Sequence, residues 1–164
     1  MKSYFATLAH YNRWANGRVY EAASDLSRED YARDCGAFFG SVHRTLNHLI
    51  VGDSIWMRRF TTEGSDFGNK LDAIPYDDFG RMSEARAALD ERIVGFVDGL
   101  DDQRIGQSLT YRNTSGKEFT DPLALLLGHF FNHQTHHRGQ VHALLTRLAG
   151  EAPSLDLVYY MRTA

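Results

Sequence analysis

Apolar residues recur at steps of three and four along four long segments of the chain, which is the spacing of helices that each bury one face. The segments cover about residues 4–23, 40–60, 83–100 and 120–149. No internal repeat or low-complexity tract accompanies them. The pattern therefore predicts an all-α fold, a four-helix bundle, and the 164 residues fit one domain over residues 1–164.

Capping and turn residues mark the ends of these predicted helices. Ser83 is a candidate N-cap for the third helix. The fourth begins at Thr120–Pro122, a capping residue followed by proline, and ends before Gly150. Between these two helices, residues 108–111 and 118–120 flank a turn sequence and predict a short hairpin. The connection over about residues 61–82 is long enough to cross the bundle, so the helices that it joins can run parallel.

Histidines are concentrated in the fourth segment. On a helical wheel, His133 and His137 lie within the apolar stripe and one turn apart, so both imidazoles can reach one ion. His129 lies at the edge of the stripe, while His136 and His142 point away from it. One inward histidine is usually satisfied by a hydrogen bond, but two at this spacing favour a shared metal, because burying both without a partner is costly.

A third ligand is expected from the second helix, where periodicity leaves His43 and His48 as alternatives. Asp53 lies in the middle of that helix's apolar stripe, either as a fourth ligand or as an outer partner of an imidazole or of Arg138; we favour the outer position. On the wheel Arg138 itself points outward or to an interhelical salt bridge. The fourth helix carries HxxxH without the glutamate of HExxH, which disfavours peptide hydrolysis.

Composition narrows the classes of function. Hydrophobic residues make up 43% and charged residues 24% of the chain, as in ordinary globular proteins. A net charge of -3 supplies no basic surface for nucleic acid. No signal peptide and no run of apolar residues that could span a membrane is present, so we expect a cytoplasmic protein without a membrane partner. With Cys35 as the single cysteine, a metal would depend on nitrogen and oxygen ligands.

Several motifs together resemble a known family. They are residues 11–16 (YNRWAN), His48-Leu49 with Asp53 and Trp56, residues 132–140 (NHQTHHRGQ) and the ending at residues 155–160. In this order they resemble the DinB-like (DNA-damage-inducible, YfiT-like) four-helix bundle proteins over nearly the whole chain. The resemblance implies an unusual order of helix directions, a homodimer and a three-histidine metal site.

In that family the ligands fall on His48, His133 and His137, and the metal is usually nickel or zinc. Ligand chemistry alone would also suit copper or iron. Characterised relatives transfer or isomerise substrates with thiols such as mycothiol, bacillithiol or glutathione, so the resemblance favours a metal-dependent transferase that joins a small thiol to an electrophile. The alternatives are a non-catalytic metal-binding structural dimer and a metal-dependent hydrolase. The sequence assigns no catalytic residue, and Cys35 is interpreted as a packed or incidental cysteine.

Overall fold

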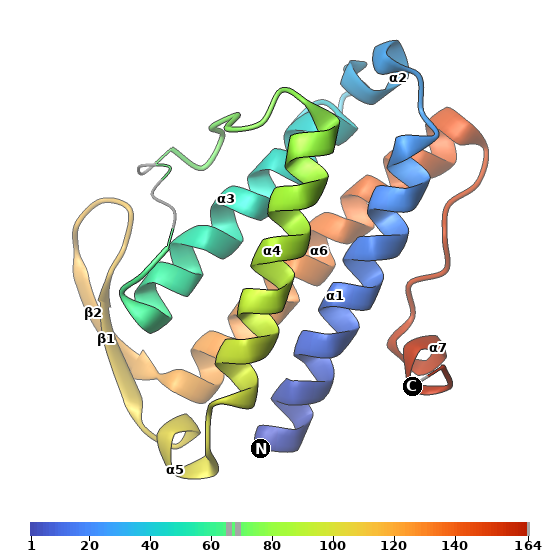
Figure 1. Cartoon of the computed structure of the whole chain (residues 1–164). Helices are drawn as coiled ribbons and strands as arrows, with labels where there is room; N and C mark the ends of the chain where they lie inside the picture. The colour runs from blue at the N-terminus through green and yellow to red at the C-terminus, as the bar shows by residue number, and fades with distance from the viewer. Residues whose placement is uncertain (65–66, 68–69, 164) are drawn as a thin grey trace.

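The computed structural model describes residues 1–64, 67 and 70–163, and it is mostly helical, as predicted (Figure 1). The predicted helical segments correspond to four long helices in the part of the chain that is described: α1 (Lys2–Ser24), α3 (Val42–Thr61), α4 (Phe79–Asp98) and α6 (Leu123–Ala149). The shorter elements are α2 (Arg28–Ala32), α5 (Asp102–Ile105), α7 (Leu157–Met161), β1 (Ser108–Arg112) and β2 (Glu118–Pro122).

The strands β1 and β2 form an antiparallel hairpin, so the predicted hairpin is confirmed and the fold is mostly helical with a small sheet. The side chain of Asn113 accepts hydrogen bonds from the backbone N–H groups of Ser115 and Lys117, and Gly116 takes a φ of 84°. Such a left-handed conformation favours glycine. The residues that stabilise this turn therefore lie within the turn itself, so its sequence is enough to predict it.

Two of the predicted helix starts are wrong. The N-cap of α4 is Asp78, whose carboxylate accepts the Arg81 N–H at 2.8 Å, five residues before the predicted Ser83. Pro122 does not begin α6 because it is the last residue of β2, paired with Ser108, and the helix begins at Leu123. The predicted end of this helix is confirmed: Gly150 adopts a φ of 83° and donates its N–H to the Thr146 carbonyl.

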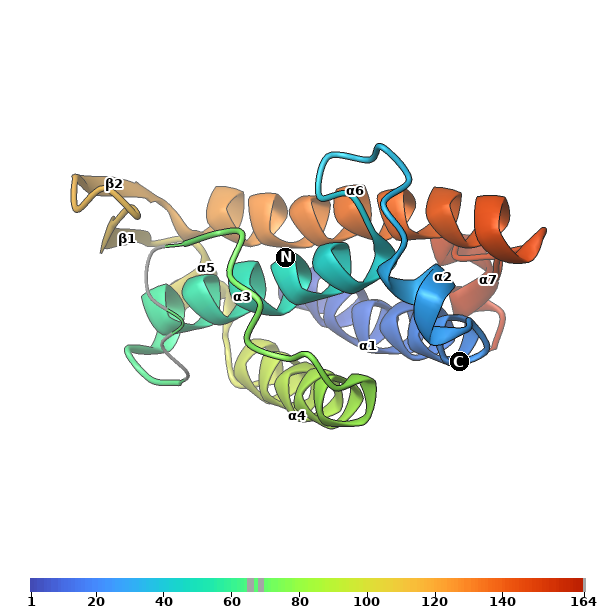
Figure 2. The ribbon, with the colours of Figure 1, turned by 90° about the horizontal axis from the view of Figure 1, so that it is seen from above.

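The four long helices surround a common apolar core. Helix α1 packs against α4 and α6, and α3 packs against the same two helices. Both α3 and α4 begin at the end of the molecule where α2 lies, so they run in the same direction, and residues 62–78 connect them (Figures 1 and 2). Residues 65–66 and 68–69 of this connection lie outside the described residues. Fully buried apolar side chains from the long helices include Leu46, Met57, Ile93, Leu127 and Phe130.

No described helix combines the length and the apolar character that crossing a membrane would require. The packing of α3 on α6 matters most for the site, because it brings the second helical segment of the sequence against the histidine-rich one.

Candidate metal centre

Three of the predicted site residues meet at the contact between α3 and α6. His48 projects from α3, and His133 and His137 project from adjacent turns of α6. One ring nitrogen of each imidazole lies within 4.8 Å of the corresponding nitrogens of the other two. The ring centroid of His137 is 4.4 Å from those of His48 and of His133. Within the described part of the chain, no other cluster of histidine, cysteine, aspartate and glutamate has this geometry.

Hydrogen bonds at the outer edge of the rings orient two of the imidazoles. The Nδ1 of His48 donates to the Leu71 carbonyl at 2.7 Å, and the Nδ1 of His137 donates to the Gln140 side-chain oxygen at 2.8 Å. Because a carbonyl oxygen only accepts, each neutral ring carries its proton on Nδ1. The lone pair of each Nε2 is therefore free, as a metal ligand requires.

The two free nitrogens face each other. The Nε2 atoms of His48 and His137 are 3.1 Å apart. Two lone pairs at this distance repel each other unless a proton or a cation lies between them. Two imidazoles bound tetrahedrally to one ion would have their nitrogens about 3.3 Å apart, given metal–nitrogen bonds of about 2.0 Å. The pair thus fits a shared transition metal.

His133 adds a nitrogen without a protein partner. Its Nδ1 is buried and forms no hydrogen bond with any described residue. A buried polar atom left in this state costs on the order of 1–3 kcal/mol, which an ion or another bound group would offset. The unpaired nitrogen is a second observation that fits a metal at this position.

The environment keeps the three rings neutral. Burial lowers the pKa of His48 and of His137, although the hydrogen bonds that they donate to the Leu71 carbonyl and to the Gln140 side-chain oxygen oppose the shift. Burial, together with the neighbouring His137 and His48, lowers the pKa of His133 to about 3. Neutral imidazoles do not have to lose a proton before they bind a cation, so the site is ready for a metal at neutral pH.

Gly52 makes room for His133. A Cβ atom added to Gly52 would lie 3.0 Å from Cε1 of the His133 ring, a contact so tight that the ring would have to shift by a few tenths of an ångström. The glycine on α3 thus lets the imidazole lie directly against that helix. Gly52 cannot be singled out from the sequence, because an isolated glycine in a helix does not indicate what packs on it.

We expect Gly52→Ala to displace the His133 ring and to weaken metal binding by roughly tenfold, the size of effect seen when groups that orient ligands are removed. Competition with a chromophoric chelator would measure the affinity. Gly95→Ala is a matched control, because an added Cβ there meets nothing within 4 Å. The control should leave the affinity unchanged and should stabilise α4 slightly. Equal affinities for both variants would contradict the proposed placement of His133.

The three imidazoles line a cavity of about 490 Å³. Phe39 stacks on the His48 ring, with their centroids 4.0 Å apart, and lines the same cavity. Among the described residues, no carboxylate or thiolate joins the histidines as a fourth ligand. A metal here would have protein nitrogens on one side and a cavity large enough for a small molecule on the other.

The remaining histidines have other surroundings. His43 donates its Nε2–H to the Tyr76 carbonyl at 2.9 Å and lies outside the cluster, so of the two alternatives on α3 it is His48 that meets the other two histidines. His129 lies against Trp56, and its centroid is 6.0 Å from that of His133. His136 is exposed, as predicted, and accepts a hydrogen bond from Gln140.

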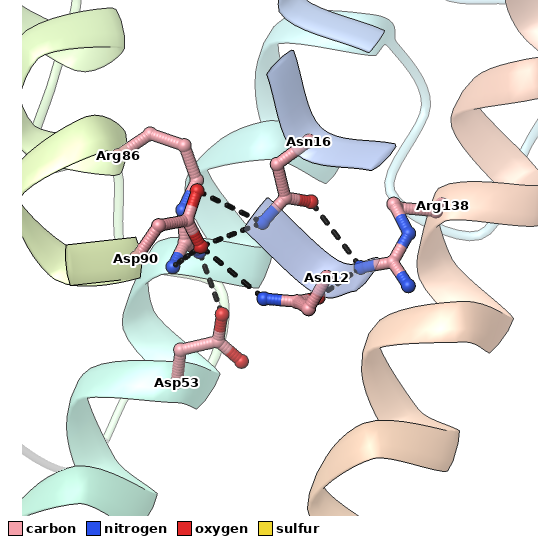
Figure 3. Close-up of polar contacts among 6 residues, drawn as sticks. All are labelled: Asn12, Asn16, Asp53, Arg86, Asp90 and Arg138. Carbon is pink, nitrogen blue, oxygen red and sulfur yellow. Dashed lines mark hydrogen bonds and ion pairs between the residues drawn. The ribbon is translucent and has the colours of Figure 1, made fainter. Parts of the chain in front are cut away.

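Asp53 belongs to a separate buried polar network. Its carboxylate is 2.6 Å from Nη1 of Arg86 on α4, and Nη2 of Arg86 is 2.8 Å from Asp90 (Figure 3). The expectation that Asp53 is an outer partner of an imidazole or of Arg138 is therefore replaced by an ion pair with Arg86. Burial raises the pKa of Asp53, and it raises that of Asp90 to about 6, although Arg86 opposes both shifts.

Asn12 and Asn16 on α1 connect the two sides of this network. Their amide nitrogens donate to Asp90, and their amide oxygens accept from Arg138 on α6 (Figure 3). Arg138 is 2% exposed, so it does not point outward; it makes an interhelical contact as expected, but with two neutral amides instead of an acid. Each asparagine thus accepts from the cation Arg138 and donates to the anion Asp90. A helical wheel drawn for α6 alone cannot indicate these partners, because they lie on other helices.

Arg86 was missed as well, although its position carried a signal. It precedes Asp90 by one turn on α4, and both lie among the buried positions of that helix. Opposite charges four residues apart within an apolar stripe are consistent with a buried pair. Cys35, by contrast, is half-buried and packs against the hydrophobic core, which agrees with a packed cysteine.

Comparison with known proteins gives results that cover the full chain. A family model described as the DinB family matches residues 1–164. The chain is also 26% identical over 168 residues to a protein named Protein DinB from Bacillus subtilis (strain 168). That alignment covers 98% of this chain and 95% of the relative. The two proteins are thus similar from end to end.

Proposed function

Because this chain belongs to the DinB family, we propose that it is a metal-dependent transferase that joins a low-molecular-weight thiol to a small electrophile. In this proposal His48, His133 and His137 hold one divalent transition metal, nickel or zinc. The four long helices act as one DinB-type four-helix bundle, a single domain over residues 1–164 that positions these side chains from α3 and α6.

One observation carries the proposal: three neutral imidazoles converge beside an accessible cavity. The facing Nε2 atoms of His48 and His137 and one ring nitrogen of His133 supply nitrogen donors. The cavity of about 490 Å³ supplies space for a ligand. When bound, a divalent metal would lower the pKa of a thiol placed on it, so that the thiolate nucleophile exists at neutral pH.

The protein's own groups would orient the ligands and limit access. The Leu71 carbonyl and the Gln140 side chain hold Nε2 of His48 and of His137 toward the centre. Phe39 covers one face of the His48 ring, which excludes water from that side. These contacts fix imidazole orientation before a metal arrives, so binding requires little reorganisation.

The two alternatives are less well supported. A structural metal would be favoured by a fourth protein ligand, but Asp53, the candidate for that role, pairs with Arg86. A hydrolase would need a general base beside the histidine pair, and HxxxH lacks the glutamate of HExxH. An open position beside a cavity is better suited to an external nucleophile.

We expect the metal-loaded protein to accelerate conjugation of mycothiol, bacillithiol or glutathione with a small electrophile such as a chlorodinitrobenzene. His137→Ala should abolish the acceleration, because the variant loses one of three proposed ligands. Thiol consumption measured with and without added metal provides the test, and His142→Ala on the same helix is the matched control, since His142 lies outside the cluster.

A second readout separates binding from turnover. Adding a thiol to the cobalt-substituted protein should change its visible spectrum, because the thiolate enters the coordination sphere. If none of the three thiols were turned over and none changed the spectrum, the transferase proposal would be overturned and a structural metal would be favoured.

The proposal includes a homodimer, as the family resemblance implies. Val158, Tyr159 and Met161 on α7 are exposed apolar residues that could be covered by a second copy. Light scattering on the purified protein would determine the oligomeric state. With a net charge of -3, nucleic acid is not among the proposed partners.

A further inference from the structure

The cavity beside the three histidines has an apolar wall formed by Phe38, Phe39 and Leu71. Phe38 is 84% exposed and Leu71 is 46% exposed, although both are large apolar side chains. Exposed apolar surface that gathers at a concave site is typical of ligand-binding sites. The wall therefore indicates what kind of molecule the cavity takes.

The segment that carries the two phenylalanines is a tight turn. The N–H of Gly40 donates to the Ala37 carbonyl at 2.8 Å, and Gly36 and Gly40 have φ angles of 72° and 82°. Glycine adopts these conformations without strain. With Phe39 stacked on His48, the turn presents Phe38 at a defined place beside the cavity instead of against the core.

The lining of the cavity contains an acidic side chain but no basic one. Among the described residues that line the cavity, Asp72 is the sole carboxylate and there is no lysine or arginine. His136 and Gln140 complete the polar part of the lining. A ligand with a carboxylate would find no cationic side chain to pair with there, and it would be repelled by Asp72.

We propose that this cavity selects ligands whose metal-binding atom carries an uncharged apolar group, best an aromatic one, and that it discriminates against ligands bearing a carboxylate near that atom. The inference rests on the proposed function, because it requires a metal with an open position. A volume of about 490 Å³ falls within the range of small-molecule sites. Thioglycolate, whose carboxylate is one carbon away from its thiol, should thus bind more weakly than an uncharged thiol of similar size.

The test is a spectroscopic titration of the cobalt-substituted protein with benzyl mercaptan, 2-mercaptoethanol and thioglycolate. Benzyl mercaptan should bind most tightly, since each buried methylene contributes a factor of about four. Phe38→Ala should weaken benzyl mercaptan roughly tenfold and 2-mercaptoethanol less than about twofold, because the small thiol leaves the wall uncovered. The control Leu125→Ala removes a side chain that is 70% exposed on α6 and is not part of the lining, so it should change neither affinity.

A second pair of variants tests the charge. Asp72→Asn should raise the affinity for thioglycolate by about two- to fivefold, the effect of one unit charge roughly 4–10 Å away in water. Asp77→Asn, which changes an acid outside this cavity, should not. Tightest binding of thioglycolate, or equal losses for both uncharged thiols in Phe38→Ala, would overturn this inference and leave the metal site intact. If the cobalt-substituted protein showed no spectral change with any thiol, the proposed function would be overturned, and the proposed ligand class with it.

Discussion

Replacing His133 with alanine should reduce the metal content of the purified protein from about one ion per chain to less than about a tenth. Outer groups that merely orient a ligand already account for about 10- to 100-fold in metal affinity, so loss of a direct ligand should cost at least as much as the upper value. His48→Ala and His137→Ala should behave in the same way. Elemental analysis after dialysis against a fixed low concentration of nickel or zinc would measure the content.

His43→Ala and His129→Ala are the matched controls for this experiment. Each removes an imidazole near the cluster but outside it, since His43 bonds the Tyr76 carbonyl and His129 lies against Trp56. Both should retain the metal. Circular dichroism would establish that all variants are folded. Retention by His133→Ala with loss by either control would show that the ligands are assigned wrongly.

Arg86→Met should lower the free energy of unfolding by about 3–5 kcal/mol, the usual cost of removing one partner of a buried ion pair. Arg86 is 3% exposed and its guanidinium lies between the carboxylates of Asp53 and Asp90. Without it, two buried acids share the interior with the more distant Arg138. Urea unfolding of the wild type and the variant at pH 7 would measure the difference.

The loss should depend on pH in a defined direction. The pKa of Asp90 in the folded protein is raised to about 6, and removing Arg86 raises it further. The native state then holds protons that the unfolded chain has already released above about pH 4, so its stability falls as pH rises through this window. The deficit of Arg86→Met relative to the wild type should therefore be small near pH 4 and large near pH 7.

Arg13→Met is the control, because it breaks an ion pair between α1 and α4 at the surface. Arg13 pairs with Glu91 at 2.8 Å, and both side chains are substantially exposed. Surface pairs contribute about 0–1 kcal/mol, so this variant should stay close to the wild type at both pH values. If Arg86→Met lost no more than Arg13→Met, the network would not be a stabilising part of the core.

Much of the helical structure is encoded locally. The apolar steps of three and four located α1, α3, α4 and α6, because a helix that buries one face must repeat that pattern along its own length. The helix ends were less certain: Asp78 and Ser83 are both good caps, and Pro122 could begin a helix or end a strand. Pairing of β1 with β2 decided the second case, which depends on a residue 14 positions away at Ser108.

The metal centre likewise depends on contacts between segments that are distant in the sequence. The wheel placed His133 and His137 on one inward stripe, but it left His43 and His48 open, and only the resemblance to a family favoured His48. The structure distinguishes the two histidines because the axial register between α3 and α6 brings the imidazole of His48, and not that of His43, to His137. This register is set by contacts between the two helices, so the sequence pattern of one helix cannot indicate it.

The residue types of the centre can be read from the periodicity and composition of the chain: imidazoles on the buried face of one helix, an acid on the buried face of another, and no second thiol. The partners of these residues cannot be read in this way. Asp53 meets Arg86, 33 residues away, and Arg138 turns inward to Asn12, 126 residues away. Periodicity states which face of a helix is buried, whereas a buried charge is satisfied by whichever side chain lies opposite, and this follows only from how the helices pack.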